Sequence, residues 1–254
     1  MLKTVSLSLE ILKMFTNKKP TWKVKELSVQ LNENQTKIYR ILETLRNNNF
    51  LIKDSYKKSY SLGTAIWEMS NSLNDNFYMK ELIHPILKLL RDQTGESVFL
   101  TILDNEEALT IDAVESETAV KHAVSVGSRT NLHNGASYRS ILAYMSLEFV
   151  DSYLGKTLIK YTENTMTNPY KIKKELEEIK QKGYAVSQGE FTEGVIATAI
   201  PIFYGGKVKG SLTVSGPEFR ITNSQINLFI KQLLYAREQI DKITQKYGFY
   251  FNLY

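Results

Sequence analysis

The sequence predicts an α+β protein in which a small winged helix-turn-helix precedes a linker helix and a larger domain with an antiparallel sheet. Three observations lead to this fold class. Two short amphipathic stretches follow one another between residues 23 and 48, a two-strand pattern comes directly after them, and from residue 77 onward helical patterns accompany runs of strand-forming residues. We place the winged helix-turn-helix at residues 1–62, the linker helix at 63–77 and the larger domain at 78–254.

The helix-turn-helix is predicted from the spacing of apolar residues. Over residues 24–31 apolar side chains recur three and four positions apart, as one face of a helix requires, and residues 32–34 then break the helix. A second helix is expected over residues 35–48, with an inward face formed by Ile38, Ile41, Leu42 and Leu45. At about 100° per residue, the opposite face carries Thr36, Arg40, Glu43 and Asn47.

Two further elements complete this module. A helix over residues 4–15 supplies apolar surface, and strands at 50–53 and 58–62 flank a polar turn as a hairpin. Helix, turn, helix and hairpin form a winged helix, although three surface helices and a hairpin of an ordinary domain fit the same spacing. Charge favours a nucleic-acid reader: residues 1–62 hold 12 Lys and Arg against 5 Asp and Glu, a net +7, whereas residues 63–254 hold 20 against 22, a net −2.

The start of the second helix is the expected reader of double-stranded DNA, because the N-terminal part of a recognition helix contacts base edges. Arg40 is suited to a bidentate guanine contact or to a phosphate. Lysines of the hairpin are expected on phosphates, and a dimer would prefer a roughly palindromic operator. The candidate DNA-binding residues are Gln35, Thr36, Lys37, Tyr39, Arg40, Lys57 and Lys58.

Composition excludes several classes of protein. The sequence has no cysteine, which excludes disulfides, thiolate catalysis and cysteine-based zinc fingers, and His84, His122 and His133 show no metal-ligand spacing. No apolar run approaches the roughly 18 residues of a membrane span, and the N-terminus lacks a signal-peptide core, so we expect a cytoplasmic protein without membrane contact. No nucleophile elbow, Walker loop or zinc-protease motif occurs, so we expect neither catalysis nor a cofactor.

After the linker helix, expected at residues 64–76, the pattern is that of a mixed domain. Helices are expected over residues 79–91, 136–146, 148–154, 168–182 and 223–246. Strands are expected over 97–103, 108–114, 120–126, 184–187, 195–203 and 207–214, with Gly205 and Gly206 in a tight turn before the last. The aromatic tail, 247–254, is expected to pack on the domain or to contact a second subunit.

Several stretches resemble the IclR family of transcriptional regulators, in the family's order and over nearly the whole chain. In the larger domain they are Val126–Ser137 with Ile141–Ala143, Gly183–Ala185, Glu190, Gly194-Val195, Ala199–Phe203, Ser215–Pro217 and Arg220. Residues 36–42 and Leu62-Gly63 resemble the family's recognition helix and wing exit. The resemblance implies a GAF-like effector domain for a small, usually anionic metabolite, a linker helix that helps dimerisation, and a homodimer or homotetramer that acts as repressor, activator or both.

The effector pocket follows from the resemblance and from local electrostatics. Ala136 and Ser137 open a helix directly after a glycine, where backbone N–H groups and the helix dipole favour a carboxylate. Family members hold ligand carboxylates at this position. Thr213 and Ser215 alternate on one strand, so their side chains project to the same face. The candidate effector-binding residues are Ala136, Ser137, Ser187, Ala197, Thr213 and Ser215.

The chain departs from the family at three places in this pocket. Tyr138-Arg139-Ser140 stands where Gly-Lys-Ala is usual, Ser187 replaces a common acidic residue, and Ala197 replaces a common cysteine. We expect Tyr138 to narrow the pocket. Two functions remain open: a regulator whose operator affinity is controlled by a small carboxylate metabolite, or a regulator whose larger domain serves only assembly or a protein partner.

Overall fold

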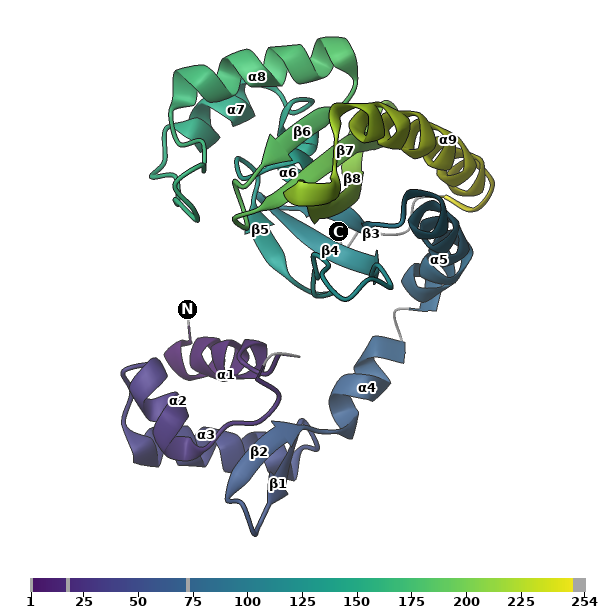
Figure 1. The fold of residues 1–254 in the computed structure, drawn as a ribbon. Coiled ribbons are helices and arrows are strands. Elements are labelled where there is room, and N and C mark those ends of the chain that lie inside the picture. Colours follow the sequence, from purple (N-terminus) through teal and green to yellow (C-terminus); the bar gives the residue numbers. More distant parts are fainter. Residues whose placement is uncertain (1, 17–18, 72–73, 249–254) are drawn as a thin grey trace. The chain divides into compact units, whose positions relative to one another are not determined.

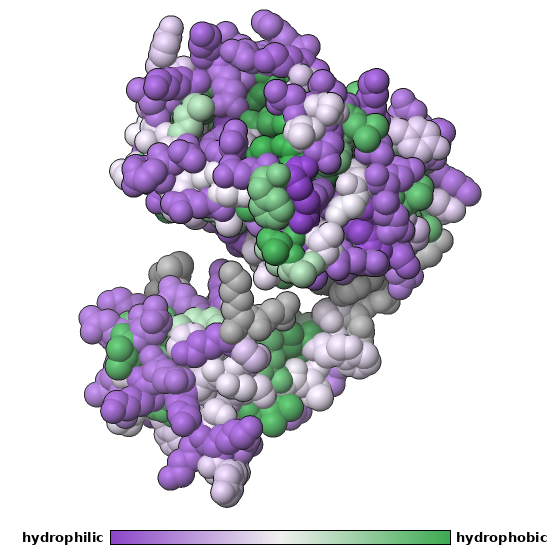
Figure 2. Space-filling model, in the orientation of Figure 1, coloured by the Kyte–Doolittle hydropathy of each residue, from purple (hydrophilic) through white to green (hydrophobic). Residues whose placement is uncertain are grey.

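The structure is a computed structural model that describes residues 2–16, 19–71 and 74–248. The chain divides into two compact units, Met1–Asn74 and Asp75–Tyr254 (Figure 1). The N-terminal unit has one cluster of buried hydrophobic residues and the larger unit has two among the described residues. Within the described ranges, no helix is both long and apolar enough to cross a membrane. On the face drawn in Figure 2, most of the surface of each unit is hydrophilic, and smaller hydrophobic areas interrupt the hydrophilic surface within each unit.

The N-terminal unit consists of helices and one hairpin, in the predicted order. Its elements are α1 (Lys3–Lys13), α2 (Val24–Gln30), α3 (Gln35–Asn47), β1 (Leu51–Asp54), β2 (Ser59–Leu62) and α4 (Thr64–Asn71). The two strands pair antiparallel, with Leu51 opposite Leu62. The Asn34 side chain accepts the backbone N–H of Thr36 at 2.7 Å and so caps α3. This cap fixes the residue at which α3 begins.

The apolar face predicted for α3 forms the centre of the N-terminal core. Ile38, Ile41 and Leu42 are buried together with Leu7 and Ile11 of α1 and Leu27 of α2. Trp22 joins this core, and its Nε1 donates to the carbonyl oxygen of Met14 at 2.9 Å. Because one face of α3 is fixed in this core, the opposite face is held outward on a rigid backbone.

The larger unit contains helices and strands in mixed order. They are α5 (Asn74–Thr94), β3 (Ser97–Asp104), β4 (Glu107–Val114), β5 (Arg129–Asn131), α6 (Ala136–Leu142), α7 (Leu147–Leu154), α8 (Pro169–Lys182), β6 (Ala185–Gln188), β7 (Val195–Tyr204), β8 (Lys207–Pro217), η1 (Glu218–Arg220) and α9 (Asn223–Tyr247). The tight turn expected at Gly205 and Gly206 is present, and both glycines have positive φ.

The strands form one antiparallel sheet in the order β5-β4-β3-β8-β7-β6. Its central strands, β3 and β8, are distant in sequence, and Phe99 lies opposite Thr213. Helices α5 and α9 share one core with the sheet, while α6, α7 and α8 share a second core (Figure 1). The predicted α+β class with an antiparallel sheet is therefore confirmed for this unit.

The prediction of a strand over residues 120–126 is wrong. These residues form no strand, and Val120 and Val126 are exposed. The edge of the sheet is formed instead by β5, whose Thr130 pairs with Ala108 of β4. Residues 118–120 are held by Arg220, whose guanidinium donates to the carbonyl oxygen of Val120 at 2.8 Å and to Thr118 Oγ1 at 3.0 Å. Alternation of apolar residues alone did not distinguish a strand from this irregular segment.

Three other helix boundaries differ from the predicted ones or lie outside the described residues. The helix expected over 136–146 ends at Leu142, and the helix expected over 79–91 begins earlier, at Asn74. The linker helix expected to reach residue 76 is α4 up to Asn71, and residues 72–73 lie outside the described residues. Residues 249–254 of the aromatic tail also lie outside them.

Candidate functional site

The outer face of α3 carries the helical residues that were predicted to contact DNA. Gln35, Thr36, Tyr39 and Arg40 are exposed, whereas Lys37 is half-buried and its Nζ lies 2.7 Å from Glu33 Oε1. The Arg40 side chain has no hydrogen bond or ion pair to any described residue. Its guanidinium is therefore available to an external acceptor.

A groove of about 470 Å³ lies between α1 and the first half of α3. It is lined by Thr4, Ser8, Asn34, Thr36, Lys37, Arg40, Ile41 and Thr44. All of these side chains except Ile41 are polar or cationic. Hydroxyl, amide and cationic donors of this kind contact the sugar-phosphate backbone in DNA-binding proteins.

The turn of the β1–β2 hairpin exposes both of its candidate lysines, Lys57 and Lys58. The Asp54 carboxylate accepts the backbone N–H groups of Tyr56 and Lys57, each at 2.9 Å, and Lys58 has a φ of 51°. The N–H of Lys57 is the main reason why the pKa of Asp54 lies below its usual value. The turn therefore has a defined backbone shape and a lysine pair at its tip.

Glu43 does not belong to the outward face of α3, contrary to the helical-wheel prediction. Its Oε1 accepts the hydroxyl of Tyr60 at 2.7 Å and the ammonium of Lys53 at 3.0 Å. The hydrogen bond from Tyr60 is the main cause of the lowered pKa of Glu43. Lys53 also lies over the ring of Tyr39, 5.2 Å from its centroid. Glu43 thus joins the hairpin to α3 instead of pointing outward from the helix.

In the larger unit, four of the six predicted effector residues line one small cavity. The cavity measures about 30 Å³ and lies at the start of α6. Its lining includes Ala136, Ser137, Ser187 and Ala197, whereas Thr213 and Ser215 do not line it. Thr213 Oγ1 is buried without a hydrogen-bond partner among the described residues. The expectation that Thr213 and Ser215 border the same space as Ala136 is therefore not met in this structure.

One backbone donor expected to be free at the start of α6, the N–H of Ala136, is already engaged, and the Ser137 side chain has a partner of its own. The backbone N–H of Ala136 donates to Ser187 Oγ at 2.9 Å, and the hydroxyls of Ser137 and Ser211 are 2.9 Å apart. The first turn of a helix leaves its N–H groups without partners inside the helix. An anion at this position would therefore meet the N–H groups of Ser137 and Tyr138, and would meet that of Ala136 only by displacing Ser187.

Tyr138 narrows the cavity, as expected. It lines the cavity, is only 4% exposed, and meets the ring of Phe191 edge-on at 6.2 Å. Phe191 in turn lies 5.4 Å from the ring of Tyr161 and is 37% exposed. An aromatic group that reaches the surface therefore forms one wall of the cavity.

The buried ion cluster around Arg139 was not predicted. Arg139 is fully buried, and its guanidinium pairs with both carboxylate oxygens of Glu190 and, at 2.9 Å, with Glu175. The carbonyl oxygen of Glu190 accepts the hydroxyl of Thr165 at 2.7 Å. These bonds fix the residue directly before Phe191. A single arginine within the otherwise mostly apolar or small residues 136–143 was the available sequence signal.

His122 and Phe99 also line the cavity and were not predicted. The Nδ1 of His122 lies 2.8 Å from Ser215 Oγ, and its ring meets Phe99 edge-on at 6.3 Å. Burial lowers the pKa of His122. No sequence spacing connects these residues to the start of α6, because Phe99 reaches the cavity from β3 and His122 reaches it from the segment between β4 and β5.

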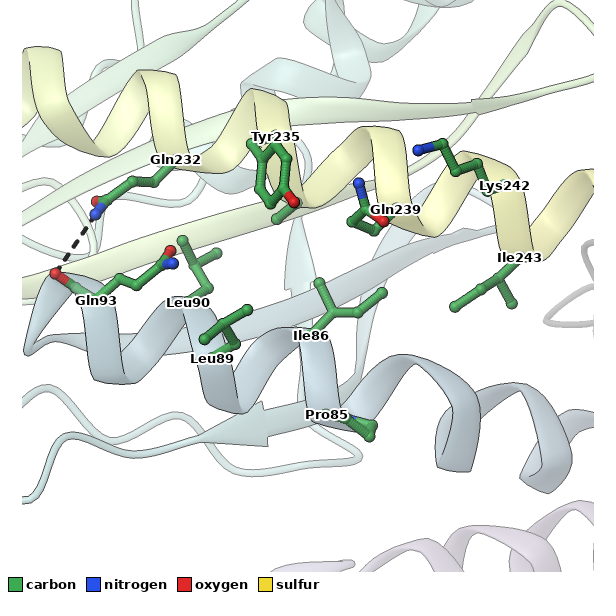
Figure 3. Close-up of a pocket in the computed structure, with 11 residues that line it drawn as sticks. Pro85, Ile86, Leu89, Leu90, Gln93, Gln232, Tyr235, Gln239, Lys242 and Ile243 are labelled. Carbon is green, nitrogen blue, oxygen red and sulfur yellow. Dashed lines mark hydrogen bonds between the residues drawn. The ribbon is translucent and has the colours of Figure 1, made fainter.

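A second and larger hollow lies between α5 and α9 (Figure 3). This groove measures about 420 Å³, and its α5 side is formed largely by Pro85, Ile86, Leu89 and Leu90. Figure 3 shows Tyr235, Gln239, Lys242 and Ile243 on the α9 side, with Gln232 donating to the carbonyl oxygen of Gln93 at 3.4 Å. Leu89 and Tyr235 are 51% and 56% exposed. No predicted site residue lines this groove.

Residues 73–242 match the family model for the bacterial transcriptional regulator IclR C-terminal domain. The chain belongs to the IclR family. The HTH-type transcriptional regulator KipR of Bacillus subtilis (strain 168) is 28% identical over 242 residues, which cover 94% of this chain and 96% of KipR. The transcriptional repressor IclR of Escherichia coli (strain K12) is 26% identical over 227 residues, which cover 88% of this chain and 82% of that protein.

A solved IclR homolog shows the same fold. It comes from Microbacterium hydrocarbonoxydans and was crystallised in complex with 4-hydroxybenzoate; it aligns with a TM-score of 0.81 over 94% of this chain and 99% of its own, at 17% identity. The IclR family match contains the sheet, the small cavity and nearly all of the α5–α9 groove. The family assignment made from the sequence is confirmed.

Proposed function

We propose that this IclR-family chain is a DNA-binding regulator whose operator affinity is controlled by a small carboxylate metabolite bound in residues 78–254. The observation that carries the proposal is the exposed start of α3, with Arg40 unpaired, within residues 1–62, whose net charge is +7. In this proposal residues 1–62 act as a winged helix-turn-helix, with Gln35, Thr36, Lys37, Tyr39 and Arg40 in the major groove and the lysines of the hairpin on phosphates. The name of KipR as an HTH-type regulator supports this reading.

The subunits are proposed to act as a homodimer or homotetramer. Residues 63–77 would serve as the linker helix, and α4 within them exposes Trp67 to 68%, an apolar surface that a second subunit can cover. A two-fold dimer carries two DNA-binding modules and therefore favours a roughly palindromic operator. The repressor name of the Escherichia coli relative supports repression as the mode of action. Sequencing the DNA that the protein retains from a genomic library tests operator binding and its symmetry together.

The double substitution Lys57→Ala, Lys58→Ala tests the hairpin. Each lost phosphate contact should reduce the slope of log affinity against log salt by about 0.9, to a similar extent on all DNA sequences. The measurement is a salt titration of DNA binding by fluorescence anisotropy. Lys171→Ala, Lys174→Ala is the matched control, because it removes two exposed lysines from the other unit. A wild-type slope in the hairpin variant would show that Lys57 and Lys58 do not contact DNA.

For the effector, the support is the position of the small cavity and the ligand of a homolog. The cavity lies where the first N–H groups of α6 favour an anion, and the Microbacterium homolog of the same fold was solved with an aromatic carboxylate. About 30 Å³ holds only about one or two water molecules. Binding must therefore displace part of the wall, and Phe191 is an aromatic wall residue that already reaches the surface.

Thermal-shift measurements with a panel of small organic acids test effector binding. An acid that binds the native protein should raise its stability by about 2.7 kcal/mol at 100 times the dissociation constant. Gly135→Val serves as the site variant, because its φ of 83° and its position at the cavity disfavour any side chain. An effect that is equal in wild type and in a folded Gly135→Val protein would place the binding elsewhere. No effect from any acid contradicts the effector proposal.

The cavity volumes favour a second candidate, in which the larger unit serves assembly without sensing a metabolite. The small cavity is nearly filled, whereas the α5–α9 groove of about 420 Å³ presents half-exposed apolar side chains. A second copy of this chain is the occupant that fits a homo-oligomeric regulator. Leu89→Glu should then produce the next smaller assembly in sedimentation velocity. Leu147→Glu, at an exposed position of α7 that does not line the groove, is the control. An unchanged assembly in Leu89→Glu would exclude the groove.

A further inference from the structure

His122 is a polar group that the proposed binding of a carboxylate leaves without a role. It lies in the irregular segment between β4 and β5, yet its ring enters the larger unit and lines the small cavity. Two contacts hold the ring in place: the 2.8 Å contact between Nδ1 and Ser215 Oγ, and the edge-on contact with Phe99. A ring held on both sides has a fixed orientation toward the cavity.

The Ser215 hydroxyl decides which ring nitrogen carries the hydrogen. Among the described residues, Ser215 Oγ contacts only Nδ1 of His122, and Ser215 is fully buried. A buried hydroxyl that did not donate would leave its hydrogen without an acceptor, at a cost. Donation from Ser215 makes Nδ1 the acceptor and places the ring hydrogen on Nε2. Burial lowers the pKa of His122, which keeps the ring neutral near pH 7.

The second ring nitrogen has no hydrogen-bond partner in the part of the chain that the structure describes. No described residue forms a hydrogen bond with Nε2 of His122, and this atom is not among the fully buried polar atoms that lack a partner. Nε2 therefore keeps accessible surface, and His122 is one of the residues that line the small cavity. The start of α6 forms another wall of the same cavity.

We infer that His122 is a specificity-determining residue whose Nε2–H donates a hydrogen bond to an oxygen of the effector other than its carboxylate, with Ser215 as the positioning residue. This inference rests on the proposed function. The proposed ligand class is thereby limited to short hydroxy or keto carboxylates. Their carboxylate meets the N–H groups of α6, and their hydroxyl or keto oxygen accepts the hydrogen bond from His122. Ser215, predicted as a direct ligand contact, acts through His122 instead.

The first experiment measures the tautomer in the full-length protein without ligand. The chain has only three histidines, so long-range ¹H–¹⁵N correlation spectra can be assigned with single histidine substitutions. The expected result is one tautomer for His122, with hydrogen on Nε2, and a mixture of tautomers in Ser215→Ala. Hydrogen on Nδ1 in the wild-type protein would overturn the inference, whatever the protein binds.

The second experiment compares pairs of acids that differ by one oxygen. Two pairs of acids are titrated by calorimetry against wild type, His122→Phe and His84→Phe. The pairs are butanoate with 3-hydroxybutanoate and propanoate with pyruvate. Wild type and His84→Phe, which changes a histidine outside the cavity, should prefer the oxygenated acid by about tenfold, a typical gain for one hydrogen bond. His122→Phe keeps an aromatic ring against Phe99 and should lose that preference.

The outcomes separate the inference from the function on which it rests. Equal preferences in wild type and His122→Phe would overturn the role of His122 and leave effector binding intact. Binding of no acid, together with unchanged His122 resonances on addition of each acid, would overturn both the role and the sensing function. If His122→Phe does not fold, His122→Gln takes its place, because the glutamine side chain keeps a hydrogen-bond donor in a different geometry. The inference then requires that His122→Gln prefers the oxygenated acid less than wild type does.

Discussion

Replacing Arg139 by alanine should destabilise the larger unit by about 3–5 kcal/mol, the usual cost of removing one partner from a buried ion pair. The guanidinium is fully buried and holds Glu190, which is 8% exposed, and Glu175. Without it, two carboxylates remain in a poorly solvated site, and burial already raises the pKa of Glu175 in the intact protein. The measurement is the unfolding transition of the larger unit within the full chain.

The pH dependence of this loss has a definite sign. In Arg139→Ala the folded pKa of Glu175, which burial already raises in the intact protein, should lie further above its unfolded value of about 4.3, because the nearby positive charge is gone. A carboxyl group with a raised folded pKa disfavours the folded state increasingly as the pH rises above the unfolded pKa, and this penalty disappears below it. The deficit relative to wild type should therefore be largest near neutral pH and shrink toward pH 4.

Two matched variants test the explanation. Arg139→Lys keeps the positive charge but loses the bidentate geometry, so its loss should be smaller than that of Arg139→Ala. Lys182→Ala breaks the exposed pair with Glu178, about half of whose side-chain surface is accessible, and should cost less than about 1 kcal/mol. A loss below about 1 kcal/mol in Arg139→Ala would show that the cluster does not hold the cavity wall.

Arg40→Ala should weaken operator binding by about 1–3 kcal/mol if the guanidinium reads a base. Arg40 is exposed near the start of α3 and its side chain has no hydrogen bond or ion pair to a described residue, so the substitution should leave the stability of the N-terminal unit unchanged. Gel-shift titrations with the recovered operator and with unrelated DNA measure the effect. A loss confined to the operator identifies a base contact, whereas an equal loss on both DNAs identifies a phosphate contact.

Arg40→Lys distinguishes the two roles further. A lysine keeps the charge but lacks the planar fork that matches guanine, so a phosphate contact should survive and a guanine contact should not. Glu43→Gln is a control on the same helix, because Glu43 faces the hairpin and not the outer surface. Operator affinity unchanged by Arg40→Ala would remove this residue from the DNA-binding surface.

Local periodicity was sufficient to predict most of the elements. The spacing of Ile38, Ile41 and Leu42 identified the buried face of α3, because the side chains of a helix repeat every 3.6 residues wherever the helix lies. Glycine-rich turns and alternating strand residues likewise predicted β7 and β8. The same reasoning failed at residues 120–126, where the alternation was present but no neighbouring strand paired with it.

The candidate site was predictable only in part. The start of α6 and Ser187 were identified from family-like stretches, and the structure brings them to one cavity. The bond between Ala136 and Ser187 joins residues 51 positions apart, and that between His122 and Ser215 joins residues 93 positions apart. Such pairs depend on the register of the sheet and on how α6 packs against it, which no local pattern contains.

The sequence by itself determined the family, the order of the helices and strands, the antiparallel α+β class of the larger unit and the basic character of the N-terminal unit. These properties depend on residue type and short spacing. Tertiary structure alone decided that Glu43 turns toward the hairpin, that Arg139 is buried between two glutamates, and that the cavity holds only about 30 Å³. Each depends on which distant side chains compete for the same space or the same hydrogen bond, and that competition is settled by packing.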